Sequence, residues 1–137
     1  MYDMPKASAL QFHNYRVEEL MFRSTPVSDD QREFELNPQI EHKVVELGDD
    51  RYDINLSIAI YSTEERPMPF ELKVSLVGQF TFCDEESGIP EQTKKIILRE
   101  NTVSILFPFL RSTVASLTTS ANIPTLVLPI MNFASED

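Results

Sequence analysis

The stretch from residue 101 to residue 133 reads NTVSILFPFLRSTVASLTTSANIPTLVLPIMNF. Its first part carries apolar residues at helical spacing, and its second part is an extended apolar segment interrupted by Pro124 and Pro129. We expect the first part to lie on a sheet formed by the residues before it. The sequence therefore predicts an α+β fold: a four-stranded antiparallel sheet, one main helix packed on one face, and a proline-rich C-terminal strap.

The helix is indicated by apolar residues that recur every three or four positions, which places their side chains on one face. Ile105, Phe109 and Ala115 fall outside this stripe. The helix is therefore apolar over more than the usual width, and we expect it to contact two surfaces, with another subunit as a candidate for one of them. The stripe consists of Val103, Leu106, Phe107, Leu110, Val114 and Leu117.

The ends of this helix are less clearly marked than its face. Asn101 is the candidate N-cap, and the helix is expected to end near residues 119–122, ahead of Pro124. Pro108 leaves two alternatives. Inside the helix it would remove the hydrogen bond to the carbonyl of Ser104, at a cost of roughly 3 kcal/mol unless packing compensates. Alternatively, the helix begins near Phe107 and holds Pro108 in its first turn, where proline is tolerated.

Length and composition limit the class of protein. The 137 residues suit one domain, residues 1–137, with a core of its own. The net charge of −10 opposes nucleic acid or an anionic membrane as partner, because both repel an acidic surface. Cys83 is the only cysteine, and the N-terminus lacks the features of a signal peptide. With no run of about 18 apolar residues for membrane insertion, we expect a reduced, cytoplasmic protein.

Two less regular strands are expected first. Residues 9–24 alternate with slips, which indicates a long strand broken by one or two bulges. Residues 34–47 contain Pro38, which demotes that part of the strand to an edge or a bulge. A long polar crossover between these strands lets the second lie elsewhere in the sheet. A turn is expected at residues 48–50, which read Gly-Asp-Asp.

Two more regular strands follow. Residues 51–60 and 70–82 alternate between apolar and polar, as half-buried strands do. Gly78 occupies an inward position, which suits a bulge or a close approach of the helix. Residues 83–95 are expected to be a charged connection that leads to the helix.

No constellation of side chains indicates catalysis. His13 and His42 have no partner at metal-ligand spacing, so positions on strand surfaces explain both. Cys83 precedes the acidic residues 84–86, which would raise the pKa of its thiol and disfavour a nucleophilic role. The three glycines are too far apart for a phosphate-binding loop. We expect a protein that is not an enzyme and binds no metal or cofactor.

The apolar segment after the helix, residues 123–133, suits either a final strand or a strap across the core. Its prolines restrict ladder pairing. Part of its surface is therefore expected to face a groove or a neighbouring subunit.

These segments resemble the SecB family of export chaperones. Residues 105–109 and Arg111 match the helix motif of that family, and Gly78 and Phe80 match the glycine, any residue, phenylalanine signature of its fourth strand. The order of four strands, helix and strap covers nearly the whole chain. The segment after the helix matches at Pro124, Leu126, Leu128, Pro129, Asn132 and Phe133.

The resemblance implies helices on one side of a four-stranded antiparallel sheet. It implies a homo-oligomer, a dimer or a dimer of dimers, in which the first helix and first strand build interfaces. It also implies apolar grooves that hold unfolded preproteins and an acidic sheet surface that docks the SecA motor.

The sequence departs from the family pattern at its end. Family members continue into a second helix that flanks the groove, whereas this sequence stops at Asp137, four residues after Phe133. Ile130 replaces the second proline of the strap. The chain looks most like shortened SecB-like proteins, of the uncharacterised kind found in Gram-positive bacteria.

The motor-docking positions also differ. Glu19 matches one acidic docking position of the family. Arg23, Glu71 and Lys73 stand where the family has an acidic residue, a leucine and an acidic residue. The prediction that SecA docks at Glu19 therefore rests on the resemblance alone.

Two functions are consistent with these observations. The first is a non-enzymatic chaperone or polypeptide-binding protein that holds unfolded apolar segments, with preprotein export as one setting. The second is an oligomeric assembly or regulatory protein that binds one defined partner by adding its strand to a sheet edge. The candidate groove or interface residues are Phe107, Phe109, Leu110, Leu126, Leu128, Ile130 and Phe133.

Overall fold

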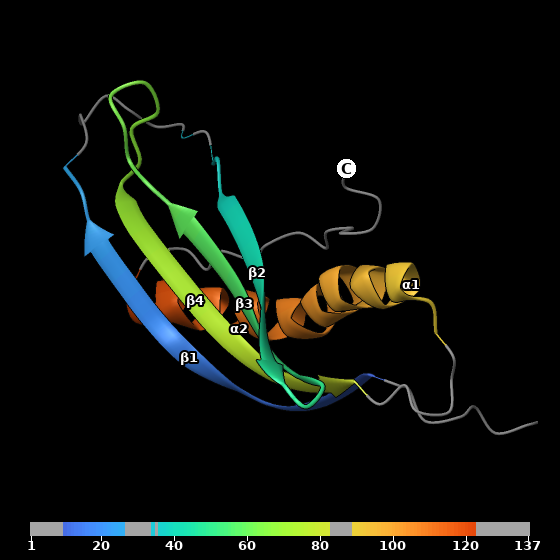
Figure 1. Cartoon of the computed structure of the whole chain (residues 1–137). Helices are drawn as coiled ribbons and strands as arrows, with labels where there is room; N and C mark the ends of the chain where they lie inside the picture. Colours follow the sequence, from blue (N-terminus) through green and yellow to red (C-terminus); the bar gives the residue numbers. More distant parts are fainter. Residues whose placement is uncertain (1–9, 27–33, 35, 83–88, 123–137) are drawn as a thin grey trace, which may run out of the picture.

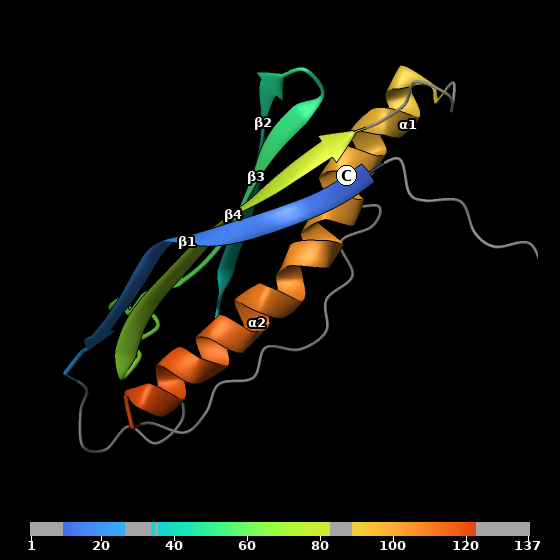
Figure 2. The same ribbon diagram turned by 90° about the horizontal axis from the view of Figure 1, so that it is seen from below.

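The computed structural model describes residues 10–26, 34, 36–82 and 89–122. Antiparallel strands form one four-stranded sheet in the order β1-β4-β3-β2. A long helical segment crosses one face of this sheet, and no described element covers the other face (Figure 1, Figure 2). The strands are β1 (Leu10–Ser24), β2 (Gln39–Gly48), β3 (Arg51–Ile60) and β4 (Phe70–Phe82).

The two edge strands differ in regularity. β1 pairs with β4 and shifts register between Phe12 and Asn14 and again between Val17 and Glu19. These shifts confirm the bulges that the slipped alternation predicts. β2 begins directly after Pro38 and pairs with β3 with a single register shift, next to the turn, between Glu46 and Gly48. The connection between β1 and β2 therefore carries the chain from one edge of the sheet to the other.

A tight turn joins β2 to β3, as predicted. Asp49 and Asp50 both adopt left-handed backbone angles, with φ of 56° and 58°. Two successive residues with positive φ are typical of a type I′ hairpin turn, whose twist matches that of the flanking strands. Gly48 precedes them with φ of 90°, a value that suits a residue without a Cβ.

The core lies between the helix and the inward face of β3 and β4. Gly78 lies on this face, and a Cβ atom built on it would lie only 2.7 Å from Cδ2 of Leu106. Of the two explanations for this glycine, the close approach of the helix is therefore the correct one. The inward residues without solvent exposure are Ile54, Leu56, Ile58, Leu72, Val74 and Leu76.

The helical segment begins earlier than the sequence predicts. It consists of α1 (Glu91–Ile96), a π-helical turn (η1, Ile97–Asn101) and α2 (Thr102–Ser120). The prediction that Asn101 caps the helix is wrong, because Asn101 itself has helical backbone angles of −71° and −37°. The apolar spacing that marks α2 does not extend into α1, which has no buried residue. For this reason, the end of the expected charged connection is in fact helical.

Pro108 lies inside α2, so the first of its two alternatives is correct. Both Pro108 and Ser104, whose carbonyl loses its helical partner, are exposed. Water can therefore satisfy that carbonyl, which reduces the cost of the missing bond.

In the described part of the chain, no helix combines the length and apolarity that a bilayer crossing requires.

Lys94 ties α1 to the hairpin end of the sheet. Its Nζ lies 3.4 Å from Oδ1 of Asp50 and 5.7 Å and 5.2 Å from the ring centroids of Tyr52 and Phe82. Interaction with the Tyr52 side chain and, after it, with the Asp50 carboxylate raises the pKa of Lys94 to about 12. This charged contact positions a helix that buries no residue of its own.

Candidate functional site

The helix-facing side of β1 carries a row of apolar residues that the helix covers only in part. Val17 lies opposite Leu76, and Leu20 lies opposite Val74. Directly opposite residues of an antiparallel pair point to the same face, so Val17 and Leu20 point to the helix side. Nevertheless, they are 45% and 52% exposed. We call this row the β1 strip: Phe12, Tyr15, Val17, Leu20 and Phe22.

Aromatic contacts cover the β1 strip at the level of Phe12 and Tyr15. The ring of Phe109 on α2 lies 4.6 Å from that of Tyr15, in a stacked arrangement, and 5.9 Å from that of Phe12. The ring centroid of Phe12 also lies 5.1 Å from that of Phe80 on β4. The helix therefore reaches β1 through Phe109.

A second aromatic contact lies at the far end of the strip. Phe22 stacks on Phe70 of β4 with ring centroids 5.6 Å apart. Val17 and Leu20 lie between these two aromatic contacts, so the uncovered apolar surface is bounded at both ends by rings. Such a surface suits apolar side chains of a partner.

The residues predicted for a groove or interface separate into three groups. Phe107 and Leu110 are 6% and 0% exposed and belong to the core, so they offer no side-chain surface to a ligand. Phe109 is half-buried and contacts the β1 strip. The remaining candidates, Leu126, Leu128, Ile130 and Phe133, lie outside the described residues.

Sequence reasoning did not assign Val17 and Leu20 to a site. Their alternation identified a strand, but alternation does not show how far a helix covers that strand. Two signals were available: the resemblance implies that the first strand builds interfaces, and the long crossover after β1 allows β1 and β2 to occupy opposite edges of the sheet. An edge strand extends furthest from a single central helix.

Glu19 lies on the other face of the sheet, away from the helix. Its Oε1 lies 3.2 Å from Nζ of Lys73, and Nη2 of Arg23 lies 2.9 Å from Oε1 of Glu71. The hydrogen bond to the Glu19 carboxylate raises the pKa of Lys73. The positions compared with the motor-docking surface thus come together as ion pairs, and the carboxylate of Glu19 is already engaged.

The two histidines lie apart from any cluster of metal ligands among the described residues. Nε2 of His13 lies 2.8 Å from Oγ1 of Thr81, and His42 is exposed on β2. Among the residues that the structure describes, no three His, Cys, Asp or Glu side chains gather as metal ligands do.

The family model described as "Preprotein translocase subunit SecB" matches residues 9–135. The chain belongs to the SecB family. This match confirms the resemblance seen in the helix and strand motifs, and the sheet and helix match the expected SecB-like fold.

Two relatives of this chain differ in how much of their length is aligned. An uncharacterised protein of Methanocaldococcus jannaschii is 29% identical over 135 residues, which cover 96% of this chain and 84% of that protein. The protein-export protein SecB of Anaplasma phagocytophilum is 36% identical over 84 residues, which cover 61% of this chain and 52% of that protein. The alignment thus spans about half of that SecB protein.

A solved structure has the same fold. The SecB-like chaperone of Mycobacterium tuberculosis, in complex with a ChAD peptide from the HigA1 antitoxin, superposes with a TM-score of 0.70. The superposition covers 89% of this chain and 90% of the M. tuberculosis chain at 14% sequence identity. At this identity the comparison establishes the fold.

Proposed function

We propose that this chain is a cytoplasmic, non-enzymatic chaperone that holds extended apolar segments of unfolded polypeptides, including preproteins. The observation that carries the proposal is the uncovered part of the β1 strip, where Val17 and Leu20 are 45% and 52% exposed between two aromatic contacts. Membership of the SecB family supports it. The peptide bound by the SecB-like chaperone of M. tuberculosis adds support, because that chain shares this fold.

Binding at this surface would depend on summed apolar burial. Complete burial of a Val or Leu side chain contributes roughly 1.5 to 3 kcal/mol. Val17 and Leu20 are about half covered already, so a client would gain about 1 kcal/mol at each. Ordering a client side chain costs a similar amount. Several contacts are therefore needed, and the half-buried Phe109 and the apolar residues of segment 123–133 are proposed to provide them.

The proposed chaperone assembles as a homo-oligomer, a dimer or a dimer of dimers, in which the side chains of the β1 strip stay open to clients even where the first strand contributes to a subunit interface. SecA docking at Glu19 stays a prediction. The motor would have to compete with Lys73 for the Glu19 carboxylate, because these groups lie 3.2 Å apart. We therefore propose polypeptide holding as the primary activity and export as one setting for it.

Calorimetric titration with a permanently unfolded, slightly basic polypeptide at two salt concentrations tests this function. We expect micromolar or tighter binding that persists at high salt, because apolar burial is not screened. A Val17→Glu/Leu20→Glu double variant should bind at least about tenfold more weakly, since charge at this surface opposes apolar contact. Val45→Glu is the matched control, because Val45 is 39% exposed and pairs with Asp53 on the opposite face. Equal binding by parent and double variant would exclude the β1 strip as the site.

A second function is favoured by the regularity of β2. From Gln39 to Glu46, β2 pairs with β3 without a register shift, and its other side forms the edge of the sheet. A regular free edge can accept the strand of one defined partner. Competition separates the two functions: unrelated unfolded clients displace one another from a general chaperone, whereas a dedicated assembly protein responds to one partner only.

A further inference from the structure

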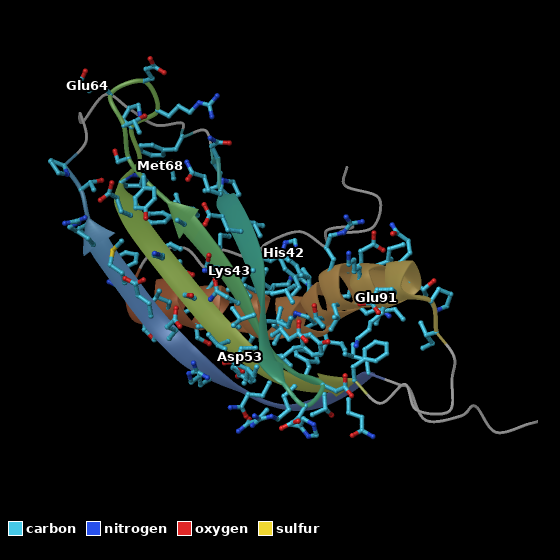
Figure 3. All side chains as sticks on the ribbon, in the orientation of Figure 1. His42, Lys43, Asp53, Glu64, Met68 and Glu91 are labelled. Carbon is cyan, nitrogen blue, oxygen red and sulfur yellow. The ribbon has the colours of Figure 1, made fainter. Side chains whose placement is uncertain are left out.

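A hollow of about 210 Å³ lies on the face of the sheet opposite the helix, near the β2–β3 hairpin. Asp53, labelled in Figure 3, marks its position. Arg51 pairs with Thr81 and Asp53 with Gln79, and these positions alternate with the inward Tyr52 and Phe80. The lining of this outer hollow includes His13, Leu47, Arg51, Asp53, Gln79 and Thr81.

Bulges on both edge strands supply side chains to the outer hollow. His13 is the extra residue of β1 where the register shifts between Phe12 and Asn14. Leu47 is the extra residue of β2 where the register shifts between Glu46 and Gly48. A bulge redirects the side chain of its extra residue, and bulges are over-represented next to functional sites. Two bulges on different strands thus converge on one hollow.

The outer hollow contains one basic and one acidic side chain. Arg51 and Asp53 are two residues apart on β3, so they share a face with Cα atoms about 6.6 Å apart. No ion pair joins them in the described part of the chain, and the Arg51 side chain makes one long hydrogen bond, 3.4 Å from Nε to the carbonyl of Gly48. Both charges therefore remain available to a ligand.

Neutral groups complete the lining. His13 and Thr81 form one hydrogen bond, with 2.8 Å between Nε2 and Oγ1. A neutral imidazole and a hydroxyl group each carry one donor, so one of the two donors remains for a ligand. Gln79 offers both a donor and an acceptor. Leu47 is 47% exposed and forms an apolar wall. The lining thus combines both charges, neutral hydrogen-bonding groups and one apolar surface.

This combination selects a class of ligand. A simple anion would be repelled by Asp53 and by the net charge of −10, and a simple cation would be repelled by Arg51. We propose that the outer hollow binds a free α-amino acid with an apolar side chain, in its zwitterionic form. Its carboxylate binds Arg51, its ammonium group binds Asp53, and its side chain packs on Leu47. The site lies on the face opposite the β1 strip and does not depend on the proposed chaperone function.

Titration of the full chain with L-leucine, followed by amide NMR shifts, tests this site. We expect saturable shifts at Leu47, Arg51, Asp53 and Gln79, with a dissociation constant on the order of 1 mM because the ligand is small. Leucinamide lacks the carboxylate, and 4-methylpentanoate lacks the ammonium group. Each should bind at least about fivefold more weakly than leucine, since each loses one charged hydrogen bond.

Variants test whether the shifts report this hollow. Arg51→Gln should remove the preference for leucine over leucinamide, and Asp53→Asn should remove the preference over 4-methylpentanoate. Lys43→Gln is the control, because Lys43 shares the outer face through its pairing with Asn55 but does not line the hollow. The absence of saturable shifts at 10 mM (about ten times the expected constant), or equal binding of all three ligands, would overturn the proposal.

Discussion

Replacing Gly78 by alanine tests how closely the helix approaches the sheet. The added Cβ would lie 2.7 Å and 3.0 Å from the two Cδ atoms of Leu106 and 2.9 Å from Cε1 of Phe80. Favourable carbon contacts begin near 3.5 Å, so the shortest contact is too close by about 0.8 Å. Leu106 and Phe80 are 0% and 1% exposed, which leaves them little room to move.

The expected cost follows from two opposing terms. Overpacking of a core costs roughly 1 to 3 kcal/mol. Loss of backbone freedom in the unfolded chain returns about 0.4 to 1 kcal/mol when glycine becomes alanine. These ranges combine to a net cost of about 0 to 2.6 kcal/mol. Because the methyl group would meet two buried side chains, we expect Gly78→Ala to lower the free energy of unfolding by about 1 to 2 kcal/mol, the middle of this range. With a urea m-value of about 2 kcal/mol/M, this corresponds to a shift of roughly 0.5 to 1 M in the midpoint.

A double-mutant cycle identifies the cause of this loss. Leu106→Ala alone should cost about 3 to 5 kcal/mol, because it leaves a cavity under α2. In the double variant, the methyl group at residue 78 enters that cavity, so the combined loss should be smaller than the sum by about 1 to 2 kcal/mol. Urea unfolding by circular dichroism, at equal protein concentration for all four chains, provides the measurement. A strictly additive cycle would refute the close approach.

The other predictions concern surface contacts. Phe109→Asp should lower the free energy of unfolding by about 2 to 3 kcal/mol, because it replaces the ring stacked on Tyr15 with a charge; a normal urea midpoint combined with a smaller particle in light scattering would assign Phe109 to a subunit interface instead. Lys94→Met should cost about 1 kcal/mol. The pKa of Lys94 is raised from 10.5 to about 12, so the contribution of Lys94 to stability is complete below pH 10.5 and disappears as the pH rises through 12. The urea midpoints of the parent and of Lys94→Met should therefore converge across this pH range. A constant difference between the two midpoints would count against the contact. Lys73→Glu should leave the circular dichroism spectrum unchanged and lower the urea midpoint only slightly, because it replaces an ion pair on an exposed surface with two neighbouring carboxylates; a large shift of the midpoint would show that the pair is structural.

The sheet was predictable from the sequence because apolar and polar residues alternate along its strands, as the buried and exposed faces require. Ile54, Leu56 and Ile58 alternate with polar residues, and the structure buries all three without exposure. The helix stripe was predictable for the same reason, as Leu106 and Leu110 confirm. Both patterns are local consequences of burial on one side of an element.

The start of the helix was not predictable from apolar spacing. α1 begins at Glu91 but is held to the sheet by the charged and aromatic contacts of Lys94. The outer hollow was also hidden, because its lining comes from four strands and two bulges that meet only in the folded sheet. The exposure of Leu20 depends on how far α2 extends over β1, which is a property of packing between distant segments.

The π-helical turn at Ile97–Asn101 sets the angle between the side chains of α1 and those of α2 through the number of residues that it contains. In a π turn one more residue is accommodated than in an α turn, and each residue of an α-helix advances the side-chain direction by about 100°. This turn therefore sets the direction of Lys94 relative to the core side chains of α2. Removing any single residue within it would rotate α1 away from the hairpin, even though every remaining residue kept its identity. The orientation of α1 therefore depends on the number of residues in this segment and not on the identity of any one side chain in it.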